Sequence, residues 1–401
     1  MNSPLSAIKL TDRVYWVGAI DHEIRDFHGY STPLGSTYNA YLILGEKPIL
    51  IDTVKEKFFP ELMARISSVI DPQKISYLIS NHSELDHSGA LPATIAQIKP
   101  EKVFASKAGI TTLKEHFGKD LDLTEIPINQ KFTLGNANFT CIETKMLHWP
   151  ESMFTYFLDE KILFSQDAFG MHLATHQLFA DTHDRALLHH EAKKYFANIL
   201  LPYAGLVTKL ITALLSLNLE INLLATAHGP LWRQAEDIFW IIDLWKKWAA
   251  QTPQDKIIVC YSTMWGSTTK LATAIADGAS LASNIVKVMP IKTIHRSDIA
   301  TELLGAKSLI VGSPTINGQI LPEVADLLCY LKGLKFKVPF GQAFGSFGWS
   351  GEAVPRLKQE LTEMKIDLVG DAPPVKYVPD QETLINYRRL GQELGQYKYS
   401  Q

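Results

Sequence analysis

The C-terminal part of the sequence restricts the fold most, because short apolar runs alternate there with helical patterns. The apolar runs, which are typical of buried parallel strands, lie at residues 257–261, 285–289, 309–311, 340–344 and near 375–378. Helical patterns are expected after the first run, where Leu271, Ala274, Ile275 and Gly278 share one face, and at 322–331, 353–364 and from about 381. Five strands that alternate with helices predict a doubly wound parallel α/β domain.

The sequence before residue 250 has a different rhythm. Short β-type runs separated by turns lie at residues 14–17, 38–44, 48–51, 77–80, 102–105 and 161–165. Residues 249–255 then form a polar, proline-containing stretch that is typical of a linker. A chain of 401 residues also exceeds the ~250–300 residues that a single core usually serves. We therefore expect two domains, residues 1–250 and residues 255–401.

The charge balance and the cysteine count argue against several classes of protein. The 39 basic and 42 acidic residues nearly cancel, so we expect no binding to nucleic acid or to an anionic membrane surface. The three cysteines, Cys141, Cys260 and Cys329, are too few and too far apart for a disulfide framework or a cysteine-based metal cluster. The first ten residues lack a signal-peptide pattern, and the most apolar stretch, 210–224, is too polar to span a bilayer. We expect a cytoplasmic protein.

Residues 81–87 carry the densest chemical signal in the chain. Four side chains that can bind metal, His82, Glu84, Asp86 and His87, lie there between an apolar strand run and a helical pattern. Imidazole nitrogen and carboxylate oxygen suit iron, manganese or zinc. Taken alone, the segment is also compatible with a solvated acidic loop that caps a helix.

Three further ligand-type residues, His148, Asp167 and His228, each follow an apolar segment beside turn residues. Together with residues 81–87 they resemble the binuclear site of the metallo-β-lactamase superfamily, which implies a four-layer αββα sandwich. Hydrolytic members carry His-x-His-x-Asp-His, but here the second histidine is replaced by Glu84. The added carboxylate favours iron that cycles between ferrous and ferric states.

The pattern His-x-Glu-x-Asp-His, followed by His, Asp and His after 60, 18 and 60 intervening residues, resembles the flavodiiron proteins. That resemblance implies a non-haem diiron centre in which one iron takes His82, Glu84 and His148. The other iron takes Asp86, His87 and His228, and Asp167 bridges the two, although His87 is not always a direct ligand in the family. Near the pocket, the resemblance implies catalytic roles for His28, His172 and Tyr195, with the alternative that Tyr195 is an ordinary aromatic on a helix face. We expect Asp52 to be a structural acid that supports the ligand loop.

The run 257–261 leads directly into a loop rich in hydroxyl groups, residues 262–268, and then into a helix. Such a loop binds phosphate through backbone N–H groups and hydroxyls at a helix N-terminus. It is neither a Walker loop nor Gly-x-Gly-x-x-Gly, and it resembles the FMN loop of flavodoxin. Loops 312–318 and 345–351 follow the third and fourth strands, where the flavin ring would lie, and we expect Trp349 to pack beside it. The candidate FMN-binding residues are Ser262, Thr263, Met264, Trp265, Gly266, Ser267, Thr268, Ser313, Pro314, Thr315, Asn317, Gly318, Ser346, Phe347, Gly348, Trp349, Ser350 and Gly351.

The resemblance covers essentially the whole chain and implies reduction of dioxygen to water, of nitric oxide to nitrous oxide, or both. It further implies an electron donor such as rubredoxin and a head-to-tail homodimer, or a dimer of dimers, in which the FMN of one chain faces the irons of the other. The preferred gas, the donor and the choice between dimer and tetramer stay open. Two alternatives are a binuclear metallohydrolase fused to a flavodoxin, which Glu84 disfavours, and an electron carrier with a degenerate first domain, which the complete ligand set disfavours.

Overall fold

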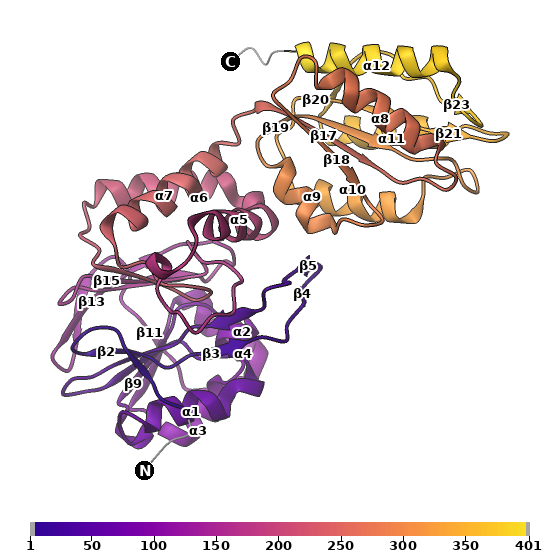
Figure 1. Cartoon of the computed structure of the whole chain (residues 1–401). Coiled ribbons are helices and arrows are strands. Elements are labelled where there is room, and N and C mark those ends of the chain that lie inside the picture. The colour runs from indigo at the N-terminus through magenta and orange to yellow at the C-terminus, as the bar shows by residue number, and fades with distance from the viewer. Residues whose placement is uncertain (1–4, 398–401) are drawn as a thin grey trace. The chain divides into compact units, whose positions relative to one another are not determined.

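The structure, a computed structural model, describes residues 5–397 (Figure 1). Residues 1–4, which belong to the N-terminal stretch expected to lack a signal-peptide pattern, and residues 398–401, at the end of the second expected domain, lie outside the described residues. The chain divides into two compact units. The first comprises Met1–His28, Thr32–Tyr195 and Tyr203–Lys246, and the second comprises Gly29–Ser31, Phe196–Pro202 and Lys247–Gln401.

The second unit therefore includes two short segments from the range 1–250 that we expected to form one domain. Hydrogen bonds explain why these two segments belong to the second unit. Ser31 Oγ lies 2.9 Å from Ser297 Oγ, and Asn198 Nδ2 donates to Ser297 O at 3.1 Å. Such contacts link residues far apart in the sequence, and no local sequence pattern predicts them.

The first unit contains two large sheets. The first sheet has the order β1-β2-β7-β8-β9-β10-β11, and its strands β8 to β11 are parallel. Its strands are β1 (Ile8–Lys9), β2 (Val14–Trp16), β7 (Tyr41–Ile43), β8 (Ile49–Ile51), β9 (Tyr77–Ser80), β10 (Lys102–Ala105) and β11 (Thr124–Glu125). The second sheet consists, in order, of β12 (Lys131–Leu134), β13 (Ala137–Glu143), β14 (Met153–Phe157), β15 (Ile162–Gln166) and β16 (Leu223–Thr226). In the second sheet, β15 and β16 run parallel. Short strands β3 (Ala19–Asp21) and β6 (Ser36–Tyr38) form a small antiparallel ribbon, and the unit also contains β4 (Asp26–Phe27). The two-residue strand β5 (Tyr30–Ser31) belongs to the second unit.

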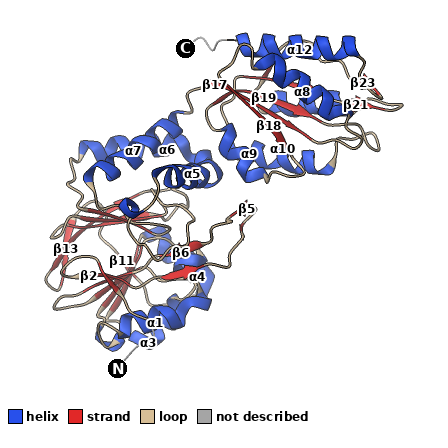
Figure 2. Cartoon of the chain, viewed as in Figure 1, coloured by secondary structure: helices blue, strands red, loops and turns tan. Residues whose placement is uncertain are grey.

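Strict alternation of side chains along the strands explains how these sheets pack. On β8, Ile49 and Ile51 point into the core between the two sheets, whereas Leu50 belongs to the core under the helices. Helices α1 (Phe59–Ser67), α3 (Leu91–Ile98) and α4 (Lys107–Phe117) cover that outer face (Figure 2). On the far side of the second sheet, Phe154 contacts Phe169, whose ring lies 4.7 Å from that of Trp245 on α7 (Ala235–Ala250). The four-layer αββα sandwich is thus confirmed.

The outer layer of the second sheet also contains α5 (Arg185–Tyr195) and α6 (Ala204–Ser216). The run Arg185–Ser216 is, among the described residues, long and apolar enough by composition to be a candidate membrane span, and 39% of its apolar window is buried. A π-helical turn, Phe196–Leu200, and a 3-10 turn, Leu201–Tyr203, interrupt it. Core helices of globular proteins have the same composition, so the run is weak evidence for a membrane protein.

The second unit is a doubly wound sheet with the order β18-β17-β19-β20-β22, all parallel. Its strands are β17 (Gln254–Tyr261), β18 (Ile285–Pro290), β19 (Ala306–Gly312), β20 (Phe340–Phe344) and β22 (Asp367–Leu368). Its helices are α8 (Ser267–Ala279), α9 (Arg296–Leu303), α10 (Pro322–Leu334), α11 (Ala353–Glu363) and α12 (Gln381–Gln396). The strand order 2-1-3-4-5 is that of flavodoxin-like folds, which confirms the expected fold class. Gly278 is required where α8 meets α12, because a Cβ there would lie 1.7 Å from Arg388 O.

The prediction that the run near 375–378 supplies the fifth strand of the parallel sheet is wrong. The apolar run near 375–378 contains β23 (Val375–Lys376), but β23 pairs with β21 (Ser346–Phe347) outside the main sheet. The fifth strand of the sheet is instead β22, which pairs with Phe340 and Gly341 of β20. Both residues of β22 are exposed and one is an aspartate, so hydrophobic patterning does not detect it. Helix α9 also went unpredicted from the sequence.

Candidate metal centre and cofactor pocket

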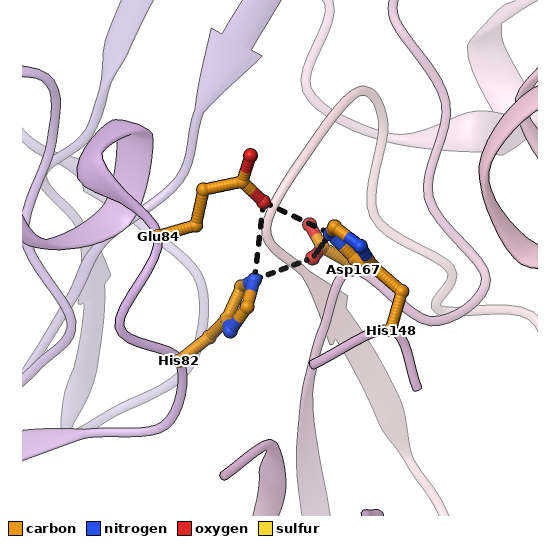
Figure 3. Close-up of side chains that lie close together, drawn as sticks. All are labelled: His82, Glu84, His148 and Asp167. Atoms are coloured by element: carbon orange, nitrogen blue, oxygen red, sulfur yellow. Dashed lines mark hydrogen bonds and ion pairs between the residues drawn. The ribbon is translucent and has the colours of Figure 1, made fainter. Parts of the chain in front are cut away.

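The structure brings all seven sequence-predicted ligands together in two groups. His82, Glu84, His148 and Asp167 form the first group, shown in Figure 3, and Asp86, His87 and His228 form the second. Within each group the ligand atoms lie within 4.8 Å of one another. The side chains come from the loop after β9 and the short helix α2 (Leu85–Ser88), from the loop before β14, and from the ends of β15 and β16. Strand ends from both sheets therefore meet at one edge of the sandwich.

Hydrogen bonds around Asn81 join the two sheets beneath the ligands. Asp52 Oδ1 accepts from the Asn81 N–H at 2.6 Å, and Oδ2 accepts from Asn81 Nδ2 at 2.9 Å. From the other sheet, Met153 N donates to Asn81 O at 3.1 Å, and Thr155 Oγ1 donates to Asn81 Oδ1 at 2.6 Å. This confirms the prediction that Asp52 supports the ligand loop.

Asp167 lies between the two groups and presents one oxygen to each. Its Oδ2 is 3.2 Å from His82 Nε2 and 3.3 Å from His148 Nε2. Its Oδ1 is 3.1 Å from His87 Nε2 and 3.3 Å from His228 Nε2. The other carboxylates belong to one group each: Glu84 Oε2 lies 2.9 Å from His148 Nε2, and Asp86 Oδ2 lies 3.2 Å from His228 Nε2. This is the arrangement that a carboxylate bridging two metal ions requires.

The donor set fits a pair of metal ions. Both oxygens of Asp86 and of Asp167, and both nitrogens of His87, are buried without a well-formed hydrogen bond. Buried polar atoms of this kind are costly unless something binds them. The ligand-type atoms within 3.1–3.3 Å of the Asp167 oxygens are all imidazole nitrogens of this cluster. Mixed imidazole and carboxylate ligands suit iron, manganese and zinc.

In the metal-free protein, protons take over part of the charge balance. Burial lowers the pKa of His148, but the facing carboxylates of Asp167 and Glu84 outweigh this and raise it to about 9. Burial acts against His228 in the same way, and Asp167 and Asp86 raise its pKa to about 10. Burial raises the pKa of Asp167, yet the neighbouring histidine charges, led by His87 and His82, hold it well below its ordinary value. Metal ions must displace the imidazole protons to bind.

The second nitrogen of two ligand rings is held by groups that the sequence analysis missed. His82 Nδ1 lies 2.8 Å from Glu151 Oε1, and His228 Nδ1 lies 2.6 Å from Thr37 O. Each contact fixes the ring so that Nε2 faces the cluster. Glu151 stands three residues after His148, so its position beside a ligand was a usable signal; Thr37 acts through its backbone, which leaves no signal in the sequence.

The three candidate catalytic residues all lie beside the cluster. His28 is exposed, and its Nε2 is 3.5 Å from Glu84 Oε1. His172 is buried, with Nδ1 2.8 Å from Ser36 Oγ and its ring 4.9 Å from that of His228. Tyr195 is buried at the end of α5, and its ring lies 5.1 Å from that of His172. Burial, followed by the charges of Asp167 and Asp86, raises the pKa of Tyr195 well above its ordinary value.

A cavity of about 690 Å³ lies in the second unit at the carboxyl ends of β17, β19 and β20. Ile316, Tyr377 and Val378 also line it and were not predicted. Among the predicted residues, the cavity is lined by Thr263, Met264, Trp265, Ser267, Pro314, Thr315, Asn317, Gly318, Ser346, Phe347, Gly348, Trp349 and Ser350. The predicted residues that do not line it are Ser262, Gly266, Thr268, Ser313 and Gly351.

The residues behind the cavity support its loops. Ser262 Oγ donates to Glu323 Oε1 at 2.6 Å, and Thr268 Oγ1 lies 3.1 Å from Ser346 Oγ. Gly266 has a positive φ of 87° at the start of α8, and Thr263 Oγ1 accepts a hydrogen bond from its N–H. Trp265 and Trp349 are 95% and 90% exposed at the rim. A hydroxyl-rich helix N-terminus beside exposed aromatic rings fits a phosphate joined to a planar ring system.

Known proteins resemble this chain over nearly its whole length. Residues 37–229 match the family model described as ODP family beta lactamase, and residues 259–391 match flavodoxin. A nitric oxide reductase of Moorella thermoacetica is 42% identical over 97% of this chain and 98% of its own. The rubredoxin oxygen:oxidoreductase of Desulfovibrio gigas is 41% identical, with a TM-score of 0.95 over 97% of this chain and 98% of that one.

A flavodiiron protein of Giardia intestinalis is 33% identical, with a TM-score of 0.92 over 98% of this chain and 97% of that one. The order of the domains, the clustered ligands and the cavity at the strand ends agree with these similarities. This chain belongs to the flavodiiron proteins.

Proposed function

We propose that this chain is an oxidoreductase that reduces dioxygen to water, nitric oxide to nitrous oxide, or both. The observation that carries the proposal is the convergence of seven ligand-type side chains in two groups on either side of Asp167. The named activities of two relatives, nitric oxide reductase and rubredoxin oxygen:oxidoreductase, support it. Bound FMN and two bound irons would together supply the four electrons that one dioxygen needs.

We assign the proposed ligands to two irons according to the distances between their side chains. His82, Glu84 and His148 would hold one iron, and Asp86, His87 and His228 would hold the other. Asp167 bridges, with one oxygen directed to each side. Three carboxylates within so small a volume leave net negative charge, which favours a metal that must reach the ferric state.

Side chains beside the ligands supply protons and exclude water. Reduction of either gas consumes protons, and His28 Nε2 is an exposed ring nitrogen 3.5 Å from Glu84 Oε1. The hydroxyl of Tyr195 stays protonated at neutral pH, because burial and nearby carboxylates raise its pKa. Burial, followed by the charge of His228, holds the pKa of His172 well below its ordinary value, so this ring is neutral. We assign these three residues to the delivery and holding of protons.

For the flavin, we propose that the loop after β17 binds the phosphate of FMN. Thr263 and Ser267 line the cavity beside the N-terminus of α8, where backbone N–H groups face outward. The loops after β19 and β20 hold the ring, with Trp349 packed against it. We place the functional division of the chain between residues 250 and 255, in the linker before β17.

A metallohydrolase fused to a flavodoxin is the competing assignment, and no observation favours it. Glu84 occupies the position of a neutral histidine in the hydrolytic pattern and contacts both His82 and His148. The extra buried charge lowers the Lewis acidity that hydrolysis would use and stabilises the higher oxidation state.

We also propose a rubredoxin-type electron donor, a head-to-tail homodimer or dimer of dimers, and a cytoplasmic location. The name of the Desulfovibrio gigas relative supports the donor. Cys141, Cys260 and Cys329 are free thiols, as expected of a reducing compartment.

Anaerobic amperometry with the reduced holoprotein tests the function. Gas consumption is recorded for dioxygen and for nitric oxide in the presence of a chemical reductant and rubredoxin. We expect the holoprotein to consume at least one of the two gases, and we expect this activity to be lost when iron is removed. Hydrolysis of a thioester or phosphodiester by a zinc-loaded chain that consumes neither gas would instead support the competing assignment.

A further inference from the structure

Glu151 differs from the other groups that hold the ligand rings because it is an anion. Its Oε1 lies 2.8 Å from His82 Nδ1 and also accepts the N–H of Ser83 at 3.0 Å. The His82 side chain is 0% exposed and that of Glu151 is 1% exposed, so the contact is shielded from water.

The rings on the other side of Asp167 have no such support among the described residues. His228 Nδ1 lies 2.6 Å from Thr37 O, a neutral backbone carbonyl. His87 Nδ1 is buried without a hydrogen-bond partner. One side of the cluster thus has an imidazole backed by a carboxylate, and the other side does not.

The two sides hold similar sets of ligands. Each has one carboxylate of its own, Glu84 or Asp86, and each shares Asp167. Glu151 adds a further carboxylate behind the ring on the His82 side.

We propose that Glu151 is a positioning residue that makes the iron on the His82 side the first of the pair to be oxidised. The inference rests on the proposed function, since it requires two irons. Starting from two ferrous ions, the loss of one electron to a one-electron oxidant leaves the ferric ion with His82, Glu84 and His148. The other ion stays ferrous with Asp86, His87 and His228.

The physical reason lies in the His82 Nδ1–H bond. A carboxylate that accepts this hydrogen bond makes Nε2 a stronger electron donor to a bound metal. The negative charge behind the ring also attracts a ferric ion more than a ferrous one, and in a buried site this difference is weakly screened. A backbone carbonyl behind His228 supplies no net charge.

A purely structural role for Glu151 is the rival explanation. Its side chain accepts the Ser83 N–H, and its backbone O accepts from Ser106 Oγ at 2.8 Å, so it also ties loops together. Glu151→Gln separates the two roles, because the amide oxygen still accepts hydrogen bonds while the charge is lost. Glu151→Asp keeps the charge and shortens the side chain.

The experiment is a redox titration of the holoprotein, with one-electron mediator dyes and with EPR and Mössbauer spectra of the half-reduced state. Supporting groups of this kind change metal affinity by roughly 10–100-fold. If loss of the charge weakens ferric binding about tenfold more than ferrous binding, the potential of that one-electron couple rises by about 59 mV. In Glu151→Gln we expect the lower of the two iron potentials to rise by about this amount, while the higher one moves less. Asp52→Asn is the matched control. It removes another buried carboxylate, which follows β8 and hydrogen-bonds Asn81 rather than a ligand ring, and we expect it to change the gap between the potentials less than Glu151→Gln does.

Each outcome has a clear reading. Two irons in Glu151→Gln with an unchanged gap between the potentials would overturn this inference and leave the proposed function intact. If Glu151→Gln loses iron, Glu151→Asp decides: retained iron with the wild-type gap supports the inference, and loss of iron there too overturns it in favour of the structural role. A wild-type chain without two irons would refute the proposed function, and this inference with it.

Discussion

Replacing Asp167 with asparagine perturbs both metal positions with a change of a few atoms. Asp167 is 1% exposed, and its two oxygens lie 3.1–3.3 Å from four imidazole nitrogens, two on each side. An amide keeps the shape of the side chain but offers one weak neutral oxygen in place of two anionic ones. We therefore expect the fold and the FMN content to survive and the iron content to fall.

The size of the effect follows from the contacts. Loss of a group that only supports a metal ligand typically costs 10–100-fold in affinity, so we expect roughly 100-fold or more for a residue that faces both metals. In the metal-free protein, removing one partner of a buried ion pair costs about 3–5 kcal/mol. The free energy of unfolding of metal-free Asp167→Asn should thus be lower by about this amount at pH ~6, where imidazoles are protonated. The difference should shrink at high pH, where His148 and His228, with pKa values of about 9 and 10, lose their protons.

The assay is the iron content per chain after dialysis, with circular dichroism, FMN absorbance and urea unfolding of the metal-free form. Asp159→Asn is the matched control, because Asp159 is a partly exposed carboxylate 3.3 Å from Arg13. We expect the control to keep both irons and to lose at most about 1 kcal/mol. Full iron content and full gas consumption in Asp167→Asn would show that Asp167 is only structural and would refute the reasoning.

Four further predictions concern proton release, the pH dependence of stability, flavin binding and assembly. The pKa values of His148 and His228 are raised to about 9 and 10, so ferrous ion added to the metal-free protein at pH 7 should release protons. Calorimetry in buffers of different ionisation enthalpy measures this release. A titration without proton release would contradict the assignment of these residues as ligands. The same rings stabilise the metal-free fold fully below their unfolded pKa of ~6.5, and urea unfolding should show that this stability is lost as pH rises through 9 to 10. The double variant Thr263→Ala, Ser267→Ala should bind FMN ~10–100-fold more weakly by fluorescence titration while keeping its iron, and unchanged affinity would exclude a phosphate site there. Co-expression of this variant with His82→Ala should restore part of the gas consumption if FMN serves the irons of the partner chain, whereas no recovery in a verified mixed dimer would exclude transfer between chains.

The sequence predicts the seven candidate ligands because of where they lie along the chain. His82 and Asp167 directly follow strands that hydrophobic patterning finds, and the ends of neighbouring strands come together in space. The same patterning finds β8, whose alternating residues Ile49, Leu50 and Ile51 pack into different cores. Periodicity and position relative to a strand end therefore indicate the loops that carry candidate ligands, and the resemblance to the flavodiiron pattern implies the full set of seven.

Other features depend on contacts that no local pattern encodes. The two exposed residues of β22 pair by backbone hydrogen bonds alone, so their side chains give no sign of a strand. Tyr377 lines the cofactor cavity because β23 pairs with β21, and these two strands lie far apart in the sequence. Thr37 holds His228 through its carbonyl, and any residue type supplies that group.

Cofactor analysis of the anaerobically purified wild-type chain is the most direct test of the central claim. Elemental analysis and the flavin spectrum are recorded first, and the reduced protein is then exposed to dioxygen or nitric oxide while both chromophores are followed. We expect two irons and one FMN per chain, and reoxidation of both by at least one gas, with no peroxide released from dioxygen. A colourless chain that holds only zinc after growth in excess iron would contradict the claim.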